Sequence, residues 1–156
     1  NEQEDLIMEE QENAFLKLVS IKGKATTKSY EDQVVFQSMS FGVSQAGEWE
    51  EGNRLSGRIT NFTDLTLSKE MDESSPSLAA ACATKEQFPS AEINLVSGGA
   101  VYFKLTLENV IVSSVSVGFH SGEARPTETV SLRFKKYTEE WGQARAGYDL
   151  STNEKV

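Results

Sequence analysis

The sequence of 156 residues is poor in the side chains on which most enzymes and metal sites depend. It has one cysteine, Cys82, and one histidine, His120. A single cysteine excludes an internal disulfide and a cysteine-rich metal centre, and it favours folding in a reducing compartment. A single histidine, with no G-x-S-x-G motif around any serine, gives no nucleophilic triad. These absences predict a protein that is not an enzyme and that holds no cofactor or metal.

Long apolar runs and clustered basic residues are also scarce. No run approaches the ~18 apolar residues of a membrane-spanning helix, and the acidic start lacks the pattern of a signal peptide. The formal net charge is −9, and the first thirteen residues hold no base and the acids Glu2, Glu4, Asp5, Glu9, Glu10 and Glu12. The only dense basic cluster is Arg133, Lys135 and Lys136. We therefore expect neither nucleic acid nor a membrane as a partner.

The remaining candidates for chemistry have simpler explanations. His120 stands beside Ser121 and Gly122 in a turn-like segment, so we expect an exposed loop histidine. Cys82 falls on the inward face of the expected helix, where a small, buried and unreactive core residue is the simpler interpretation. Adjacent acids such as Glu50 and Glu51 would point to opposite sides of an extended strand, so they are expected to be solvated charges.

Alternation of apolar and polar residues predicts a chain built mainly of strands. The alternating segments are 14–18, 34–43, 58–71, 91–96, 101–107, 110–118 and 129–137. Gly98 and Gly99 supply the positive φ angles of a tight turn between two of them. Because no βαβ rhythm is present, we expect an antiparallel sandwich or barrel.

One helix is expected after residue 74. Ser75 is suited to be its N-cap, and Pro76 to be its first residue, where the missing N–H costs nothing. Leu78 and Cys82 share the inward face at helical spacing, and Pro89 prevents the helix from continuing.

A glycine-bearing loop at 46–57 is the most conspicuous candidate for a contact site. It places Trp49 among acids, and a large ring on such a loop is often a partner anchor. Packing of Trp49 back onto its own domain is the alternative. The edges of a sheet expose unpaired backbone N–H and C=O groups. A sheet with strands such as 101–107 and 110–118 must therefore close on itself, have its edges covered, or pair them with neighbouring molecules.

Several segments resemble the haemolysin-coregulated (Hcp) family, the tube proteins of the bacterial type VI secretion system. They are MSFGVSQ at 39–45, FTDLTLSK at 62–69, Asp72 with SPSLAAACAT at 75–84, LENVIVSSVS at 107–116 and RPTETVSL at 125–132. They occur in the family's order, and the resemblance covers about 14–141. It divides the chain into an acidic arm at 1–13, an Hcp-like β-barrel domain at 14–141 and a C-terminal tail at 142–156.

The resemblance implies a mainly β fold, namely a closed antiparallel β-barrel of two packed sheets with one short α-helix, assembled as a hexameric ring. It implies a structural subunit of the inner tube, in which stacked rings are ejected by a contractile sheath and carry or stabilise small effector proteins in the lumen. The implied partners are further copies of the chain, sheath, spike and baseplate proteins, and effectors. The protein would reside in the bacterial cytoplasm before firing and be secreted afterwards.

The same resemblance assigns a role to the loop around Trp49, which in the family protrudes towards the next ring. The residues implied in ring stacking are Ala46, Gly47, Glu48, Trp49, Glu50, Glu51, Gly52 and Asn53. Two other functions remain open at this point. One is a tail-tube subunit of a phage or another contractile injection particle, and the other is a secreted β-sandwich binding module.

Overall fold

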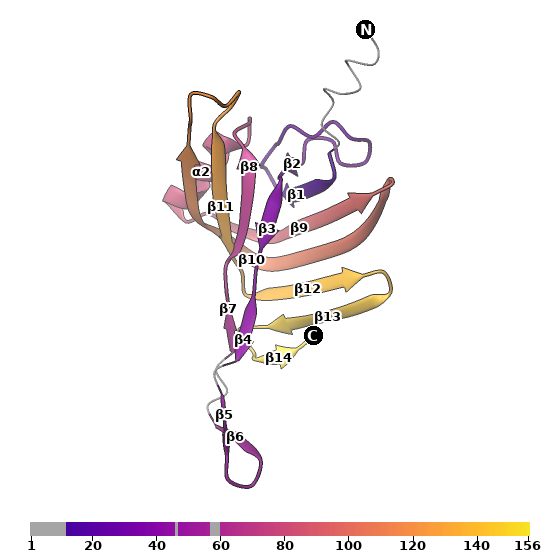
Figure 1. The fold of residues 1–156 in the computed structure, drawn as a ribbon, viewed down its shortest axis with the longest axis vertical. Helices are drawn as coiled ribbons and strands as arrows, with labels where there is room; N and C mark the ends of the chain where they lie inside the picture. The colour runs from indigo at the N-terminus through magenta and orange to yellow at the C-terminus, as the bar shows by residue number, and fades with distance from the viewer. Residues whose placement is uncertain (1–11, 46, 57–59) are drawn as a thin grey trace.

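The computed structural model describes residues 12–45, 47–56 and 60–156. Its largest element is an antiparallel sheet of ten strands, to which two short two-stranded ladders and one helix are added (Figure 1). The elements are β1 (Ala14–Leu18), β2 (Val34–Val35), β3 (Ser38–Ser40), β4 (Val43–Gln45), β5 (Glu48–Glu50), β6 (Arg54–Ser56), β7 (Thr60–Phe62), β8 (Leu65–Glu70), α2 (Ser75–Thr84), β9 (Gln87–Ser97), β10 (Ala100–Gly118), β11 (Thr127–Arg133), β12 (Lys136–Trp141), β13 (Ala144–Asp149) and β14 (Glu154–Lys155).

Strand β10 organises the sheet because it belongs to two parts of it. The strand is 19 residues long and pairs with β9 over most of its length. Its first half also pairs with β12, and its second half pairs with β11. The expected separate strands at 101–107 and 110–118 are therefore one strand. Asn109 lies between them with φ 55°, a left-handed conformation that asparagine tolerates, so the strand continues through it.

The sheet does not close into a barrel, so that expectation is wrong for the single chain. The segment expected as one strand at 34–43 is divided into β2, β3 and β4, and only β2 pairs with β1 while β3 pairs with β8. The division has a visible cause in the backbone. The Phe36 N–H donates to Ala14 O at 3.3 Å, whereas the Gln37 N–H donates to Ser68 O at 2.8 Å. The chain changes its partner strand between these residues, which interrupts the ladder.

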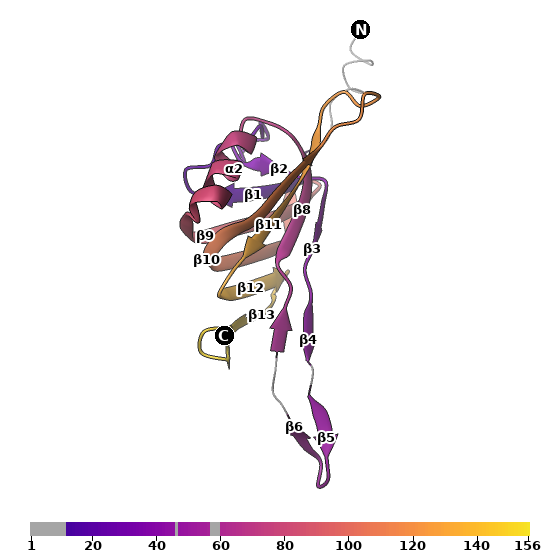
Figure 2. The same ribbon diagram turned by 90° about the vertical axis from the view of Figure 1, so that its left-hand side faces the viewer.

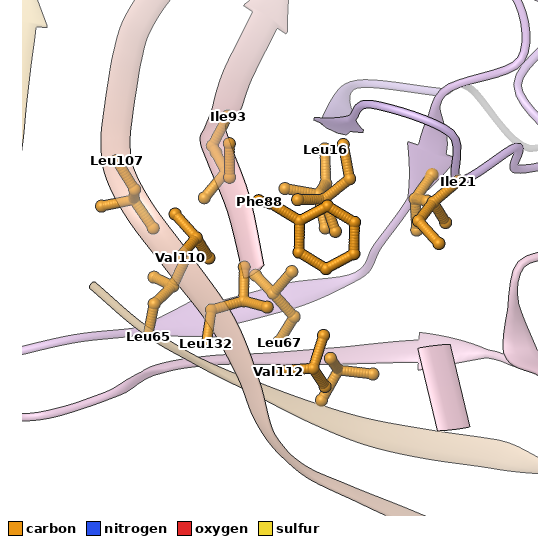
Figure 3. Close-up of a cluster of buried hydrophobic side chains, with 14 of the residues drawn as sticks. Leu16, Ile21, Leu65, Leu67, Phe88, Ile93, Leu107, Val110, Val112 and Leu132 are labelled. Atoms are coloured by element: carbon orange, nitrogen blue, oxygen red, sulfur yellow. The ribbon is translucent and has the colours of Figure 1, made fainter. Parts of the chain in front are cut away.

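The apolar core lies between the β9–β10 layer, the β8–β11 layer and the helix. Figure 3 shows Leu16 from β1, Leu67 from β8, and Phe88 and Ile93 from β9 converging on one cluster. All four side chains are buried, and those of Leu16, Leu67 and Ile93 lie in segments for which alternation predicted strands. The hairpin between β9 and β10 also matches its prediction, with φ 58° at Gly98 and 80° at Gly99.

Helix α2 forms where it was expected, but its cap differs. The N-cap is Ser74, which makes no side-chain cap hydrogen bond, and Ser75 is the first helical residue. The Ser75 hydroxyl instead accepts a hydrogen bond from the Asp72 N–H at 3.0 Å. Leu78 is fully buried, whereas Cys82 is only partly buried against the core, so the expectation of a buried thiol is met in part.

A buried ionic cluster fixes the start of the helix to the sheet. Strand β8 alternates so that Lys69 points into the core with 1% of its side chain exposed, and it meets Glu128 of β11, which is 0% exposed. The Lys69 ammonium donates to Glu128 Oε1, to Asp72 Oδ1 at 3.1 Å and to Ser75 Oγ at 3.4 Å. The Ser75 hydroxyl donates to Glu128 Oε1 at 2.7 Å. The cluster therefore links β8, β11 and α2.

The last part of the acidic arm that the structure describes is bound to the domain. Glu12 Oε1 accepts hydrogen bonds from Thr26 N and Thr27 N at 2.9 Å and from Thr27 Oγ1 at 2.6 Å. Desolvation acts to raise the pKa of Glu12, but the hydrogen bonds from the Thr27 side chain and from both backbone N–H groups outweigh it, so the pKa is lowered. Residues 1–11 of the predicted arm lie outside the described residues.

Candidate functional site: the protruding hairpin

The segment expected as a loop at 46–57 contains a hairpin that extends the fold away from its core. Strand β4 pairs with β7, and β5 pairs with β6, so two short ladders succeed one another. Gly52 with φ 85° and Asn53 with φ 60° form the turn at the far end. Figures 1 and 2 show this hairpin as the lowest part of the molecule, beyond the main sheet.

The base of the hairpin is held by polar and aromatic contacts. The Gly42 N–H donates to Thr63 Oγ1 at 2.6 Å, and the Thr63 N–H donates to Gly42 O at 2.9 Å. The ring of Phe62 lies 5.3 Å from that of Tyr137 and 5.4 Å from that of Tyr148, measured between centroids. These contacts join β7 to β12 and β13, so the base of the hairpin is anchored at the domain.

The tip presents an aromatic ring among carboxylates. Trp49 is 72% exposed, and its ring pairs with no other aromatic ring in the described part of the chain. Glu50 and Glu51, the next two residues of the chain, are also exposed. The alternative in which Trp49 packs back onto its own domain is thus not what the structure has. An exposed ring of this size is typical of an interaction site.

The structure places the predicted stacking residues together, with one exception. Gly47, Glu48, Trp49, Glu50, Glu51, Gly52 and Asn53 all lie on the protruding hairpin or at its entry. Ala46 lies outside the described residues. Their role in stacking stays a prediction, whereas their position at one end of the molecule is a structural fact.

Two further groups of exposed apolar side chains were not recognised in the sequence. The first is on β10 and β12, where Tyr102 and Trp141 lie 5.3 Å apart between ring centroids and are 40% and 63% exposed. The second is at the end of β10, where Val117 and Phe119 are 52% and 65% exposed. The side chains that face inward from these strands are also apolar. The alternation of apolar and polar residues therefore does not tell which of the apolar side chains face outward.

Two residues of the basic cluster noted in the sequence, Arg133 and Lys135, line a cavity of about 310 Å³ together with Gln87, Asn109, Ile111 and Phe134. The charges of the basic cluster are largely paired. Arg133 donates to Asp64 through Nε at 3.2 Å and through Nη2 at 3.3 Å, and Lys136 Nζ lies 3.2 Å from Glu108 Oε2. Such pairing gives no strongly positive surface for a phosphate backbone.

Catalytic chemistry finds little support in the described residues. His120 is exposed, as expected, and its Nδ1 accepts a hydrogen bond from the Gly122 N–H at 3.2 Å, a contact within its own turn. Within 12–45, 47–56 and 60–156, no three histidine, cysteine or acidic side chains are grouped as metal ligands. In the same ranges, no helix has both the length and the apolar character needed to cross a membrane.

Comparison with known proteins agrees with the resemblance. Residues 15–141 match the family described as "Type VI secretion system effector, Hcp". Protein hcp1 of Pseudomonas aeruginosa PAO1 is 32% identical over 124 residues, which cover 77% of this chain and 76% of that protein.

Two solved structures show the same fold. The crystal structure of Hcp1 from Salmonella typhimurium has a TM-score of 0.80 at 28% identity, and the match covers 92% of this chain and 98% of that one. A structure described as a type six secretion system protein has a TM-score of 0.85 at 24% identity, over 92% and 99% of the two chains. The chain therefore belongs to the Hcp family, whose members are structural, non-enzymatic proteins secreted by the type VI system.

Proposed function

We propose that this protein is the subunit of the type VI inner tube, in which hexameric rings stack along a common axis. Membership of the Hcp family supports the proposal. The observation that carries it is the protruding hairpin, which exposes 72% of Trp49 at the end of the molecule. An indole so exposed is removed from water when it meets another protein surface, which is favourable. In a tube, the next hexameric ring provides such a surface.

Contacts within a ring need a second surface. The exposed pair Tyr102 and Trp141 is suited to it, because aromatic side chains are enriched where protein surfaces associate. The short strands β3 and β14, at the two ends of the main strand order, also leave backbone groups that a neighbour could pair.

The remaining partners follow from the same role. A contractile sheath would surround the tube, spike and baseplate proteins would contact its ends, and small effector proteins would occupy the lumen. The subunit would be stored in the bacterial cytoplasm and leave the cell when the sheath contracts. The body at 14–141 would build the tube wall.

Electron microscopy of Trp49→Ala tests the proposal. Interface anchors of this kind typically cost ~2 kcal/mol or more when truncated, and the loss recurs at every subunit of a ring junction. We expect tubes to separate into intact rings, with the melting temperature of the isolated ring unchanged because Trp49 supports no core. Trp141→Ala is the matched control, since it removes an indole of similar exposure outside the hairpin.

The two variants have different expected outcomes. Trp141→Ala should weaken contacts within a ring and should not yield a population of intact single rings. Tubes of normal length for Trp49→Ala, or a protein that stays monomeric at micromolar concentration without any substitution, would contradict the proposed function.

A further inference from the structure

The main sheet has a gap where β10 changes its partner strand, and a cavity lies there. Strand β10 pairs with β12 up to Glu108 and with β11 from Ile111 onwards, while β11 ends at Arg133 and β12 begins at Lys136. Figure 1 shows β11 running upwards from this place and β12 running to the right. The cavity of about 310 Å³ is lined by Gln87, Asn109, Ile111, Arg133, Phe134 and Lys135. Its volume is at the lower end of the range that small-ligand sites have.

Part of this lining is a row of side chains on three neighbouring strands. Ile111 of β10 is opposite Gln87 of β9 and opposite Arg133 of β11 in the strand registers. Directly opposed residues point to the same face of a sheet. Because Val110 and Val112 are buried, Ile111 between them faces away from the core, and it is half-buried. The row therefore offers an apolar side chain between two polar ones.

Lys135 is the cation of this cavity that stays uncompensated. Arg133 and Lys136 are paired with acids, as described above. The Lys135 side chain is exposed, and within 12–45, 47–56 and 60–156 it makes no ion pair or hydrogen bond. Two acids stand next to lining residues in the sequence, but Glu108 is paired with Lys136 and Glu86 does not line the cavity. The cavity thus carries a positive charge that suits one negative charge on a ligand.

We infer that the cavity binds a small organic acid in which a carboxylate is joined to an apolar body. The carboxylate lies at the Lys135 ammonium, and the apolar body lies against Ile111. The side-chain amides of Gln87 and Asn109 have no hydrogen-bond partner in the part of the chain that the structure describes, so their N–H groups can donate to the same carboxylate. An apolar surface with a few convergent polar groups is the usual composition of a small-ligand site.

This site is independent of the tube role, because none of its lining residues belongs to the protruding hairpin. Four probes separate the contribution of the charge from that of the apolar body. They are phenylacetate, its neutral and cationic analogues 2-phenylethanol and 2-phenylethylamine, and acetate, which lacks the apolar body. Binding to the full-length protein is followed through the NMR signal of the Ile111 methyl group, which is identified by its loss in Ile111→Val.

The probes have different expected outcomes. Phenylacetate should shift the Ile111 signal in a saturable way, and 2-phenylethanol should do so more weakly because it cannot pair with Lys135. Acetate should give no shift, since an exposed ion pair alone contributes little. 2-Phenylethylamine should give none either, because its ammonium would meet that of Lys135.

A variant of Lys135 connects the preference for an anion to this residue. Lys135→Gln should weaken the binding of phenylacetate about two- to fivefold, the loss expected for an exposed ion pair, and leave that of 2-phenylethanol unchanged. Lys155→Gln is the matched control, because Lys155 is also exposed but lies outside the cavity, and it should change neither affinity.

Three results would each overturn the inference. They are the absence of a saturable Ile111 shift at millimolar phenylacetate, equal binding of phenylacetate and 2-phenylethylamine, and an unchanged preference for the anion in Lys135→Gln. The proposed tube role would stand in each case, because tube formation is measured separately by microscopy.

Discussion

Replacing Lys69 with methionine is the sharpest test of what holds the fold together. Methionine keeps most of the apolar stem of lysine but removes the ammonium. That group reaches Glu128 Oε1, Asp72 Oδ1 at 3.1 Å and Ser75 Oγ at 3.4 Å. The variant would leave two buried carboxylates without their cation.

The expected loss follows from what remains around each carboxylate. Asp72 keeps a hydrogen bond from Ser74 N at 2.8 Å, and Glu128 keeps the Ser75 hydroxyl at 2.7 Å. Breaking a buried ion pair by removing one partner typically costs ~3 to 5 kcal/mol, because an uncompensated charge stays in the core. For a domain of this size, each kcal/mol corresponds to ~2 to 4 °C. We expect the melting temperature to fall by roughly 6 to 20 °C.

Thermal and urea unfolding of the isolated ring or monomer would measure this loss. Lys155→Met is the matched control, because Lys155 is exposed and its replacement should change the free energy of unfolding by less than about 0.5 kcal/mol. The double variant Lys69→Met/Glu128→Leu should be more stable than Lys69→Met, since it removes the stranded charge together with its partner. A loss below about 1 kcal/mol for Lys69→Met would refute the reasoning, as would a double variant less stable than the single one.

Two further predictions concern local contacts. The pKa of Glu12 lies below its ordinary value of 4.5, so its contribution to stability is fully present above that value and is lost as the pH falls through the lower, folded-state pKa. Glu12→Gln should therefore flatten the acid limb of a stability-against-pH curve, and an unchanged limb would contradict the hydrogen bonds to Thr26 and Thr27. Gly147→Ala should cost ~1 to 3 kcal/mol in urea unfolding, because a Cβ there would lie 2.4 Å from the backbone oxygen of Tyr137 across the β12–β13 ladder. Gly118→Ala, whose Cβ meets nothing within 4 Å, is its control, and equal losses for both glycines would refute the clash.

Local sequence determined the features that depend on neighbours along the chain. The helix begins within one residue of its prediction, because Pro76 sets the φ angle of the first turn and needs no donor. The turn at Gly98 and Gly99 formed as expected, since few other residues accept two successive positive φ angles. The motifs at 39–45 and 125–132 identified the family for a different reason. They are similar to family members through shared ancestry, not through local conformational preference.

The features that the sequence did not predict depend on residues far apart in the chain. Lys69 faces inward with Leu65 and Leu67 of β8, and only the approach of β11 explains why a lysine is accepted there, through Glu128. The continuity of β10 past Asn109 depends on β9, which pairs on both sides of that residue.

The failure of the sheet to close into a barrel also depends on residues far apart in the chain. Between Phe36 and Gln37 the backbone donates first to β1 and then to β8, and which strands lie within reach is set by the packed core. The sequence by itself thus indicated a chain built mainly of strands with one helix, and it identified the family. Tertiary structure decided where strands pair, which charges are buried and that Trp49 stands clear of the domain, because pairing and burial are properties of surfaces that exist only once the chain has folded.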